Sequence, residues 1–250
     1  MPSCKICLAF YVASGCYVCG LLAYLFHRQK ISFFFLMVGF FFHKLFQIGR
    51  GWLIGIFTPN AIFNEVYFLP WCVASGGLGI KIFSNDKSSG SSSIVLLCLF
   101  SILALFFPKG IFPPSPKTWT IFSPLFFFFE VLAHACFVLG AWFAFLYLRQ
   151  RENAKFFNSF IIWGFILYSI AQVVGATWCY LGWATPFHWG DRHLQSASLW
   201  CYYAAYLHLR FLPTWDIKKK AWFSLFGSFL VFIFSYGAHF SEMNIPRLGG

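Results

Sequence analysis

The sequence predicts an all-α polytopic membrane protein with about eight transmembrane helices. Three observations support this class. Of the 250 residues, 60% are hydrophobic and 10% are charged, whereas in soluble domains about a quarter of residues are charged. The apolar residues form runs long enough to cross a bilayer. The lysines and arginines gather at the ends of these runs, as the loops of a membrane protein require.

We expect eight spans of roughly 17–25 residues each. Their predicted ranges are 6–26, 31–49, 64–81, 92–108, 130–149, 158–178, 195–212 and 221–241. Serine and glycine predict a flexible linker at 84–93, and prolines predict an ordered or PPII-like loop at 108–124. The first run lacks an A-x-A cleavage site, so we expect a retained helix rather than a signal peptide. The whole chain, 1–250, is expected to form a single integral membrane domain.

Charge counting predicts the orientation of these spans. With the N-terminus outside, the inner loops hold eleven lysines and arginines and the outer side holds six. The positive-inside rule therefore places both termini and the two loops at 108–124 and 178–195 on the extracytoplasmic side. The net charge of +11 does not indicate nucleic-acid binding, because the cations form no basic domain. The expected partner of this surface is the lipid bilayer.

The nine cysteines include two Cys-x-x-Cys pairs near the N-terminus, Cys4 with Cys7 and Cys16 with Cys19. The pairs lie about 120° apart around one predicted helix, so their four thiolates would not converge on a metal. Neither pair is followed by a histidine, which excludes a c-type haem attachment motif. We interpret these cysteines as small apolar residues of a membrane helix. No catalytic Ser-His-Asp set or glycine-rich phosphate loop indicates a hydrolase or nucleotide site.

The stretch from Gly175 to Arg210 has the most distinctive chemistry of the chain. It contains Trp178, Trp183 and Trp189 together with several cations and imidazoles, between two apolar runs. Indole faces can lie along a planar ligand, an arginine such as Arg192 can pair with its carboxylates, and an imidazole can ligate iron. These residue types favour haem as the ligand of a Trp-rich loop at 178–195.

Four histidines fall in or at the edge of predicted spans: His43, His134, His208 and His239. A polar side chain in lipid is costly unless it is satisfied, so each is either functional or held by an interhelical hydrogen bond. His134 opens the fifth predicted span and His239 closes the eighth, on the same side as the Trp-rich loop. Two imidazoles that converge from separate helices would give bis-His ligation of a haem iron.

Other polar residues leave alternatives open. His188 and His193 lie in the Trp-rich loop, where they either contact haem propionates or stay exposed. Lys44, within the second span, either extends its amine to the interface or pairs with a propionate. Glu130 lies one turn before His134, where it either orders the imidazole or faces the outer loop.

The stretch from Gly175 to Arg210 resembles the signature of the haem-handling cytochrome c assembly proteins, the CcsA/ResC group and the related CcmC and CcmF proteins. The pattern of that group is G-x-x-W-x-x-x-x-W-G-x-x-W-x-W-D-P-K-E-T-W, followed by Y-L-H-x-R. The positions that match without gaps are Gly175, Ala176, Trp178, Trp183, Trp189, Trp200 and Tyr206-Leu207-His208 with Arg210. Ala184 stands where the group has a glycine, and Arg192 where it has a lysine. The resemblance is therefore divergent in the middle of the loop.

The resemblance extends over most of the chain from 36 to 241. The surroundings of His134 and His239 are similar to the blocks with the two outer haem-ligating histidines of the group. His43 and His208 resemble its two membrane histidines, which are taken to hold haem in transit. The haem contacts that the resemblance implies are His134, His239, His43, His208, Trp178, Trp183, Trp189 and Arg192.

The implied function is cytochrome c biogenesis. The chain would transport haem b across the membrane and present it for covalent attachment to a C-x-x-C-H apocytochrome c, with a ResB/CcsB-type membrane partner. A bacterial plasma membrane or a thylakoid-type membrane is expected. The chain would be the haem-presenting subunit of a synthase complex, and whether it is itself an enzyme stays open. Two alternatives remain, namely CcmC-type delivery of haem to a carrier and a non-haem scaffold or degenerate family member.

Overall fold

The computed structural model of the chain describes residues 2–59, 62–83, 87–107, 120–150, 154–187 and 189–237. These residues are helical almost throughout, and no strand occurs among them. The chain divides into two compact units, which are unit 1 (Met1–Pro114 with His239–Gly250) and unit 2 (Ser115–Ala238). The all-α class predicted from the sequence is confirmed. The expectation of a single integral membrane domain stays a prediction.

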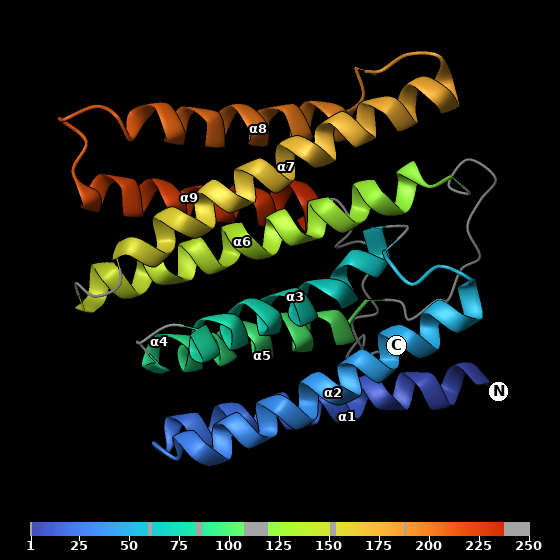
Figure 1. The fold of residues 1–250 in the computed structure, drawn as a ribbon, viewed down its shortest axis with the longest axis vertical. Helices are drawn as coiled ribbons and strands as arrows, with labels where there is room; N and C mark the ends of the chain where they lie inside the picture. Colours follow the sequence, from blue (N-terminus) through green and yellow to red (C-terminus); the bar gives the residue numbers. More distant parts are fainter. Residues whose placement is uncertain are drawn as a thin grey trace, which may run out of the picture. The chain divides into compact units, whose positions relative to one another are not determined.

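Unit 1 contains α1 (Pro2–Leu25), α2 (Gln29–Ile54), α3 (Ile62–Phe83), α4 (Lys87–Ser92) and α5 (Ile94–Leu105). α1 packs along α2 and α5, while α3 packs against α4 and α5 (Figure 1). α2 ends where Gly55 takes the left-handed conformation with φ 78° and donates its backbone N–H to Gly51 O at 2.8 Å. Glycine reaches this conformation without a steric penalty, which fixes the end of the helix.

The segment predicted as a flexible linker is partly ordered in unit 1. Lys87–Ser92 form α4, and Ser91, Ser92 and Ser93 are buried. Lys81 Nζ of α3 donates to Ser91 Oγ at 3.0 Å. Small side chains let two helices approach closely. A serine-rich composition is therefore compatible with a helix interface as well as with a flexible linker. The linker prediction therefore does not hold for Lys87–Ser92.

Unit 2 contains α6 (Phe122–Gln150), α7 (Ala154–Trp183), α8 (Asp191–Leu209) and α9 (Ile217–Tyr236). α6 packs against α7 and α9, and α8 packs against α7 and α9 (Figure 1). In the core, the rings of Phe137 and Tyr203 stack with centroids 3.6 Å apart and join α6 to α8. α9 begins at Asp216, whose carboxylate accepts the N–H of Lys219 at 2.9 Å as an N-cap.

Each of the eight predicted spans corresponds to one of these helices, and α4 is additional. Five helical segments among the described residues are long and apolar enough to cross a membrane, namely Ile6–Leu25, Gln29–Ile54, Asn64–Phe83, Phe122–Arg149 and Phe156–Trp183. Gly90–Leu105 is a shorter apolar helix. α8 is less apolar because its first turns carry charged and polar residues, and α9 begins beside three lysines. The chain is thus an integral membrane protein, and its orientation stays a prediction.

Helix boundaries differ from the prediction around the Trp-rich loop. α7 continues to Trp183 and α8 begins at Asp191, so the loop covers 184–190 instead of 178–195. α6 begins at Phe122, eight residues before the predicted start. The extensions are rich in aromatic residues, which suit the interface between membrane and water and let the helices continue through it. Residues 108–119 of the predicted Pro-rich loop lie outside the described residues.

Candidate functional site

His134 is fully buried near the middle of α6. Phe122 opens the helix twelve residues earlier, about 18 Å away along the axis, so His134 lies deeper than the predicted edge of its span. Its Nε2 lies 3.4 Å from Ser235 Oγ of α9. Its Nδ1 has no hydrogen-bond partner among the described residues. Buried polar atoms are nearly always paired, so this nitrogen is a candidate ligand atom.

The residues in contact with His134 come from α7 and α9, and one of them is bonded in turn to α8. The ring of Tyr168 (α7) lies 6.0 Å from the imidazole, and the ring of Tyr236 (α9) lies 6.3 Å from it, centroid to centroid. Tyr168 in turn donates its hydroxyl hydrogen to Ser196 O of α8 at 3.3 Å. The histidine is therefore enclosed by aromatic rings, with hydroxyl groups at its edge, in the part of unit 2 where all four helices meet.

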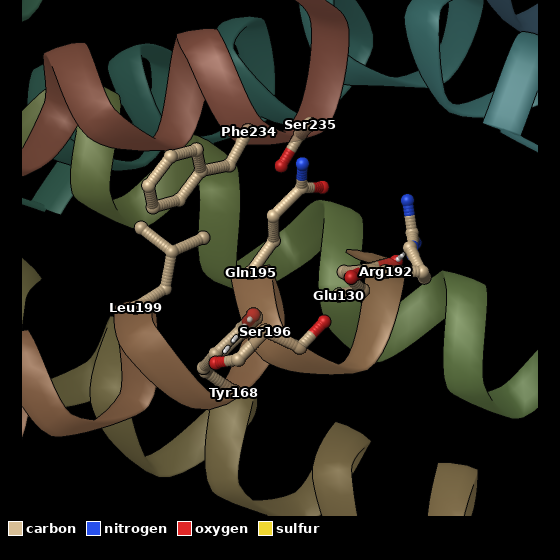
Figure 2. Close-up of a pocket in the computed structure, with 8 residues that line it drawn as sticks. All are labelled: Glu130, Tyr168, Arg192, Gln195, Ser196, Leu199, Phe234 and Ser235. Atoms are coloured by element: carbon tan, nitrogen blue, oxygen red, sulfur yellow. Dashed lines mark hydrogen bonds and ion pairs between the residues drawn. The ribbon is translucent and has the colours of Figure 1, made fainter. Parts of the chain in front are cut away.

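A small pocket opens next to Ser235, the residue that contacts His134. Its lining residues are Glu130, Tyr168, Arg192, Gln195, Ser196, Leu199, Phe234 and Ser235 (Figure 2). In Figure 2 the side chains of Gln195 and Ser235 point toward one another from α8 and α9. The enclosed space of the pocket has room for about one water molecule. A tetrapyrrole would therefore need helices or side chains around this pocket to move apart.

An ion pair forms one wall of this pocket. Arg192 Nη2, in the first turn of α8, donates to Glu130 Oε2 of α6 at 2.5 Å (Figure 2). The Glu130 side chain is 2% exposed and the Arg192 side chain 33% exposed. Glu130 was expected either to order the His134 imidazole or to face the outer loop. The structure shows neither, because the Glu130 carboxylate is buried and bonded to Arg192. The pair joins the helix of His134 to the helix that follows the Trp-rich loop.

A series of aromatic contacts leads from Arg192 to the end of α7. The Arg192 guanidinium lies 5.9 Å from the Phe126 ring centroid, and Phe126 lies 6.0 Å from Trp178. Trp178 meets Trp183 edge-on at 5.9 Å. A Cβ on Gly175 would lie 2.8 Å from the Phe126 ring, so only glycine lets α7 approach α6 here. Trp178, Trp183 and Arg192 thus belong to one connected group on three helices.

The end of α7 and the loop after it present exposed apolar side chains, which we call the aromatic surface. Its members are Tyr180, Leu181, Trp183, Phe187 and Trp189. Trp189 is 84% exposed, and its ring meets Phe187 edge-on at 5.3 Å. His193 packs against Phe187 at 5.4 Å, and its Nε2 lies 3.3 Å from Cys179 Sγ. A surface of this kind suits a flat apolar ligand or partner.

Ala184 ends α7 in a conformation that favours glycine. Its φ is 59°, and its N–H bonds Tyr180 O at 2.8 Å. In an L-residue with a Cβ this left-handed conformation costs about 1–2 kcal/mol. Ala184 is also the position where the resembling group has glycine, so one departure from the signature coincides with backbone strain.

His43, in α2 of unit 1, is also fully buried but is saturated with hydrogen bonds. Its Nε2 lies 2.8 Å from Tyr67 O of α3. Because a carbonyl only accepts, Nε2 holds the proton, and Nδ1 accepts from the Tyr17 hydroxyl of α1 at 3.3 Å. Gln47 Nε2 donates to the same Tyr67 carbonyl at 3.0 Å. The adjacent Lys44 places its amine 4.9 Å over the Trp71 ring.

The remaining predicted histidines differ in what the structure describes. His208 is exposed near the end of α8, and its Nδ1 lies 2.8 Å from Ala204 O one turn earlier. The carbonyl must accept this hydrogen, so the Nε2 lone pair of His208 points elsewhere and can bind a metal. His239 and His188 lie outside the described residues. The pairs His134 with His239 and His43 with His208 therefore stay predictions, the first because His239 lies outside the described residues and the second because its members belong to different units.

Several residues of the site were not predicted, because they belong to no sequence motif. Gln195, Ser196 and Leu199 line the pocket with Arg192 because they follow it by three, four and seven residues on one face of α8. That spacing is visible in the sequence and is the signal that would have found them. Tyr168 and Ser235 carry no such signal, because their place beside His134 depends on the packing of separate helices.

Comparison with known proteins extends the similarity along most of the chain. The family model described as "Cytochrome C assembly protein" matches residues 8–244. The cytochrome c biogenesis protein CcsA of Prochlorococcus marinus strain MIT 9515 is 24% identical over 272 aligned positions, which cover 90% of this chain and 86% of that protein. The protein of the same name from Guillardia theta is 22% identical over 241 positions, which cover 81% and 80% respectively.

Proposed function

The chain belongs to the family of cytochrome c assembly proteins, and from this premise we propose that it receives haem within the membrane and presents it on the extracytoplasmic side. There the haem is attached covalently to apocytochrome c. A role in cytochrome c biogenesis follows from the family and from relatives that bear the name CcsA. The path of the haem and the residues that hold it are the content of the proposal.

The observation that supports this proposal most is the unpartnered Nδ1 of His134. The imidazole is fully buried, aromatic rings enclose it, and one of its nitrogens has no hydrogen-bond partner among the described residues. A buried imidazole of this kind fits an iron ligand, because coordination would satisfy the nitrogen that the protein leaves unpaired. Ser235, at the other nitrogen, would orient the ring.

His239 is the proposed second ligand of this outer site. It follows Ser235 by four residues, so the chain can place it at most about 14 Å from that serine, Cα to Cα. Ser235 is itself in contact with His134. The covalent connection therefore keeps His239 within reach of a haem whose iron His134 ligates. Two imidazoles would protect the iron from other ligands while the rest of the haem stays available.

The aromatic surface and Arg192 would hold the rest of the haem at this outer site. Trp183 and Trp189 would offer their faces to the porphyrin, and Arg192 would pair with a propionate. The contacts from Arg192 through Phe126 and Trp178 to Trp183 connect these groups. Since the pocket is small in the described arrangement, haem binding would open it at the wall that Glu130 and Arg192 form.

The proposed membrane site uses His43 and His208. His208 fits a ligand because its Nδ1–H is bonded to Ala204 O and its Nε2 lone pair is available. His43 fits less directly, because the Tyr17 hydroxyl already occupies Nδ1. Ligation by His43 would require Tyr17 to turn away, while Tyr67 O would keep the ring oriented through Nε2. His43 belongs to unit 1 and His208 to unit 2.

The bound haem would supply the vinyl groups that react with the two cysteine thiols of a C-x-x-C-H segment. The residues of this chain would position it, keep its iron ligated and exclude water from the buried face. A ResB/CcsB-type membrane protein is the proposed partner in the reaction. The relatives come from a cyanobacterium and from Guillardia theta, and we propose a bacterial plasma membrane or a thylakoid-type membrane as the location.

The proposal is tested by the absorption spectrum of the full chain, purified together with its membrane partner. We expect the Soret, α and β bands of low-spin bis-His haem b. His134→Ala and His239→Ala should each remove the contribution of the outer site, while His27→Ala, which changes an exposed histidine in the turn after α1, should not. Unchanged spectra in both of the first two variants would mean that the outer site is assigned to the wrong residues.

A further inference from the structure

The ion pair between Glu130 and Arg192 bears directly on how a ligand enters the pocket beside His134. Glu130 is almost fully buried in α6, whereas Arg192 at the start of α8 is one-third exposed. Both line the pocket, and Arg192 also lies over Phe126 in the series of rings that leads to the aromatic surface. The guanidinium is therefore the part of this wall that an arriving ligand meets, and Glu130 holds it from inside.

A guanidinium forms its strongest contacts with carboxylates, because its N–H groups match the two carboxylate oxygens. In unit 2 the Glu130 carboxylate already makes this contact, 2.5 Å from Arg192 Nη2. A ligand carboxylate at the same guanidinium would displace Glu130 or share Arg192 with it. Either event brings a second negative charge beside a carboxylate that has little access to water, which is unfavourable.

We propose that Glu130 is a specificity-determining residue that competes with ligand carboxylates for Arg192. This inference rests on the proposed function, since the ligand it concerns is a haem with two propionates. Glu130 weakens the hold on the propionates and so favours release, which a protein that passes haem onward requires. While no ligand is bound, Glu130 also holds the Arg192 side chain of α8 against α6. The ion pair then closes the pocket at its exposed wall.

The test measures dissociation constants of two ligands for the full chain in detergent micelles. The first ligand is haem, and the second is haem whose two propionates are methyl esters and cannot pair with a guanidinium. Glu130→Gln keeps the size and hydrogen bonding of the side chain but removes its charge. We expect it to tighten binding of haem about tenfold, because a charge-assisted contact is restored to the ligand. Binding of the ester should not change.

A matched control is Asp191→Asn, which removes the same charge from the exposed residue next to Arg192. It should leave the affinity for both ligands unchanged, which separates competition for Arg192 from a general change in local charge. Glu130→Asp keeps the charge on a shorter side chain and should tighten haem binding less than Glu130→Gln. This second variant keeps the test available if the glutamine variant does not fold.

The outcomes separate the two proposals. If the wild-type chain binds haem and His134→Ala weakens that binding, but Glu130→Gln leaves it equal or weaker, the competition by Glu130 is refuted and the proposed function stands. The same conclusion follows if Glu130→Gln changes the haem and its ester alike. If the wild-type chain binds no haem with or without its partner, the proposed function fails and the inference about Glu130 fails with it.

Discussion

Two histidines are fully buried among the residues that the structure describes, His43 in unit 1 and His134 in unit 2, and they use their nitrogens differently. Both nitrogens of His43 are occupied, one by the carbonyl of Tyr67 and the other by the hydroxyl of Tyr17. His134 has one long contact, to Ser235, and its other nitrogen has no partner among the described residues. Both imidazoles are equally buried. They differ in how many of their ring nitrogens have a hydrogen-bond partner on the surrounding helices.

This difference separates a histidine that holds helices together from one that is available to a ligand. Three helices of unit 1 meet at His43, and its hydrogen bonds are part of their packing. In unit 2, aromatic rings lie around His134 and a pocket lies beside its contact Ser235. The helices there are joined by other contacts, such as the stack of Phe137 on Tyr203. Both histidines have apolar neighbours in the sequence, and these neighbours alone do not distinguish a structural histidine from a ligand.

The largest effect that follows from the comparison concerns stability. His43→Leu should lower the free energy of unfolding by about 2 kcal/mol or more, because the buried Tyr17 hydroxyl loses its partner. His134→Leu is the matched change in unit 2 and should alter stability by about 1 kcal/mol or less, since it removes one nitrogen that has no partner and one that makes only a long contact to Ser235. Denaturant titration in detergent micelles, followed by circular dichroism, measures both. Equal losses in the two variants would contradict the comparison.

A smaller effect concerns Tyr17, which occupies the only nitrogen of His43 that could ligate a metal. Tyr17→Phe removes this competing hydrogen bond and should raise haem occupancy of the membrane site about two- to tenfold, the equivalent of one net hydrogen bond. Haem content is measured in a His134→Ala background, where the outer site is disabled. Tyr24→Phe, on the same helix α1, is the control. Unchanged occupancy in Tyr17→Phe would show that His43 does not act as a ligand through Nδ1.

The smallest effect concerns the ends of two helices, one in each unit. Gly55 ends α2 with φ 78°, and Ala184 ends α7 with φ 59°, so the same left-handed turn is made with and without a Cβ. Ala184→Gly should stabilise the protein by about 1 kcal/mol, and Gly55→Ala should destabilise it by a similar amount. Thermal unfolding of the two variants in detergent checks this. A loss of stability in Ala184→Gly would mean that the turn at the Trp-rich loop is not strained.

Much of the helical architecture could be predicted from the sequence, because lipid leaves helices as the simplest way to satisfy the backbone of a long apolar run. Each predicted span corresponds to a helix for this reason. The errors fall where composition is ambiguous. Lys87–Ser92, which are mostly small polar residues, form a helix that packs on α3. The aromatic residues before 130 start α6 earlier than predicted, and those after Trp178 extend α7 beyond its predicted end.

The candidate site was less predictable, because it depends on pairs of residues far apart in the sequence. Burial of His43 and His134 follows from their apolar neighbours. The partners of each ring do not, since Tyr17 lies on a different helix from His43 and Ser235 follows His134 by about a hundred residues. Arg192 was expected to meet a ligand carboxylate, and its pairing with Glu130 is a tertiary contact that no local pattern indicates.

The measurement that tests the central claim most directly is chemical rescue of His134→Ala with free imidazole. Removal of a buried ring leaves a cavity that a molecule of the same shape can fill. The spectrum of the purified variant should lose the bis-His bands of the outer site and regain them as imidazole is added, whereas His43→Ala should keep those outer-site bands without imidazole. A His134→Ala spectrum identical to that of the wild type, or a loss that imidazole does not restore, would contradict ligation by His134.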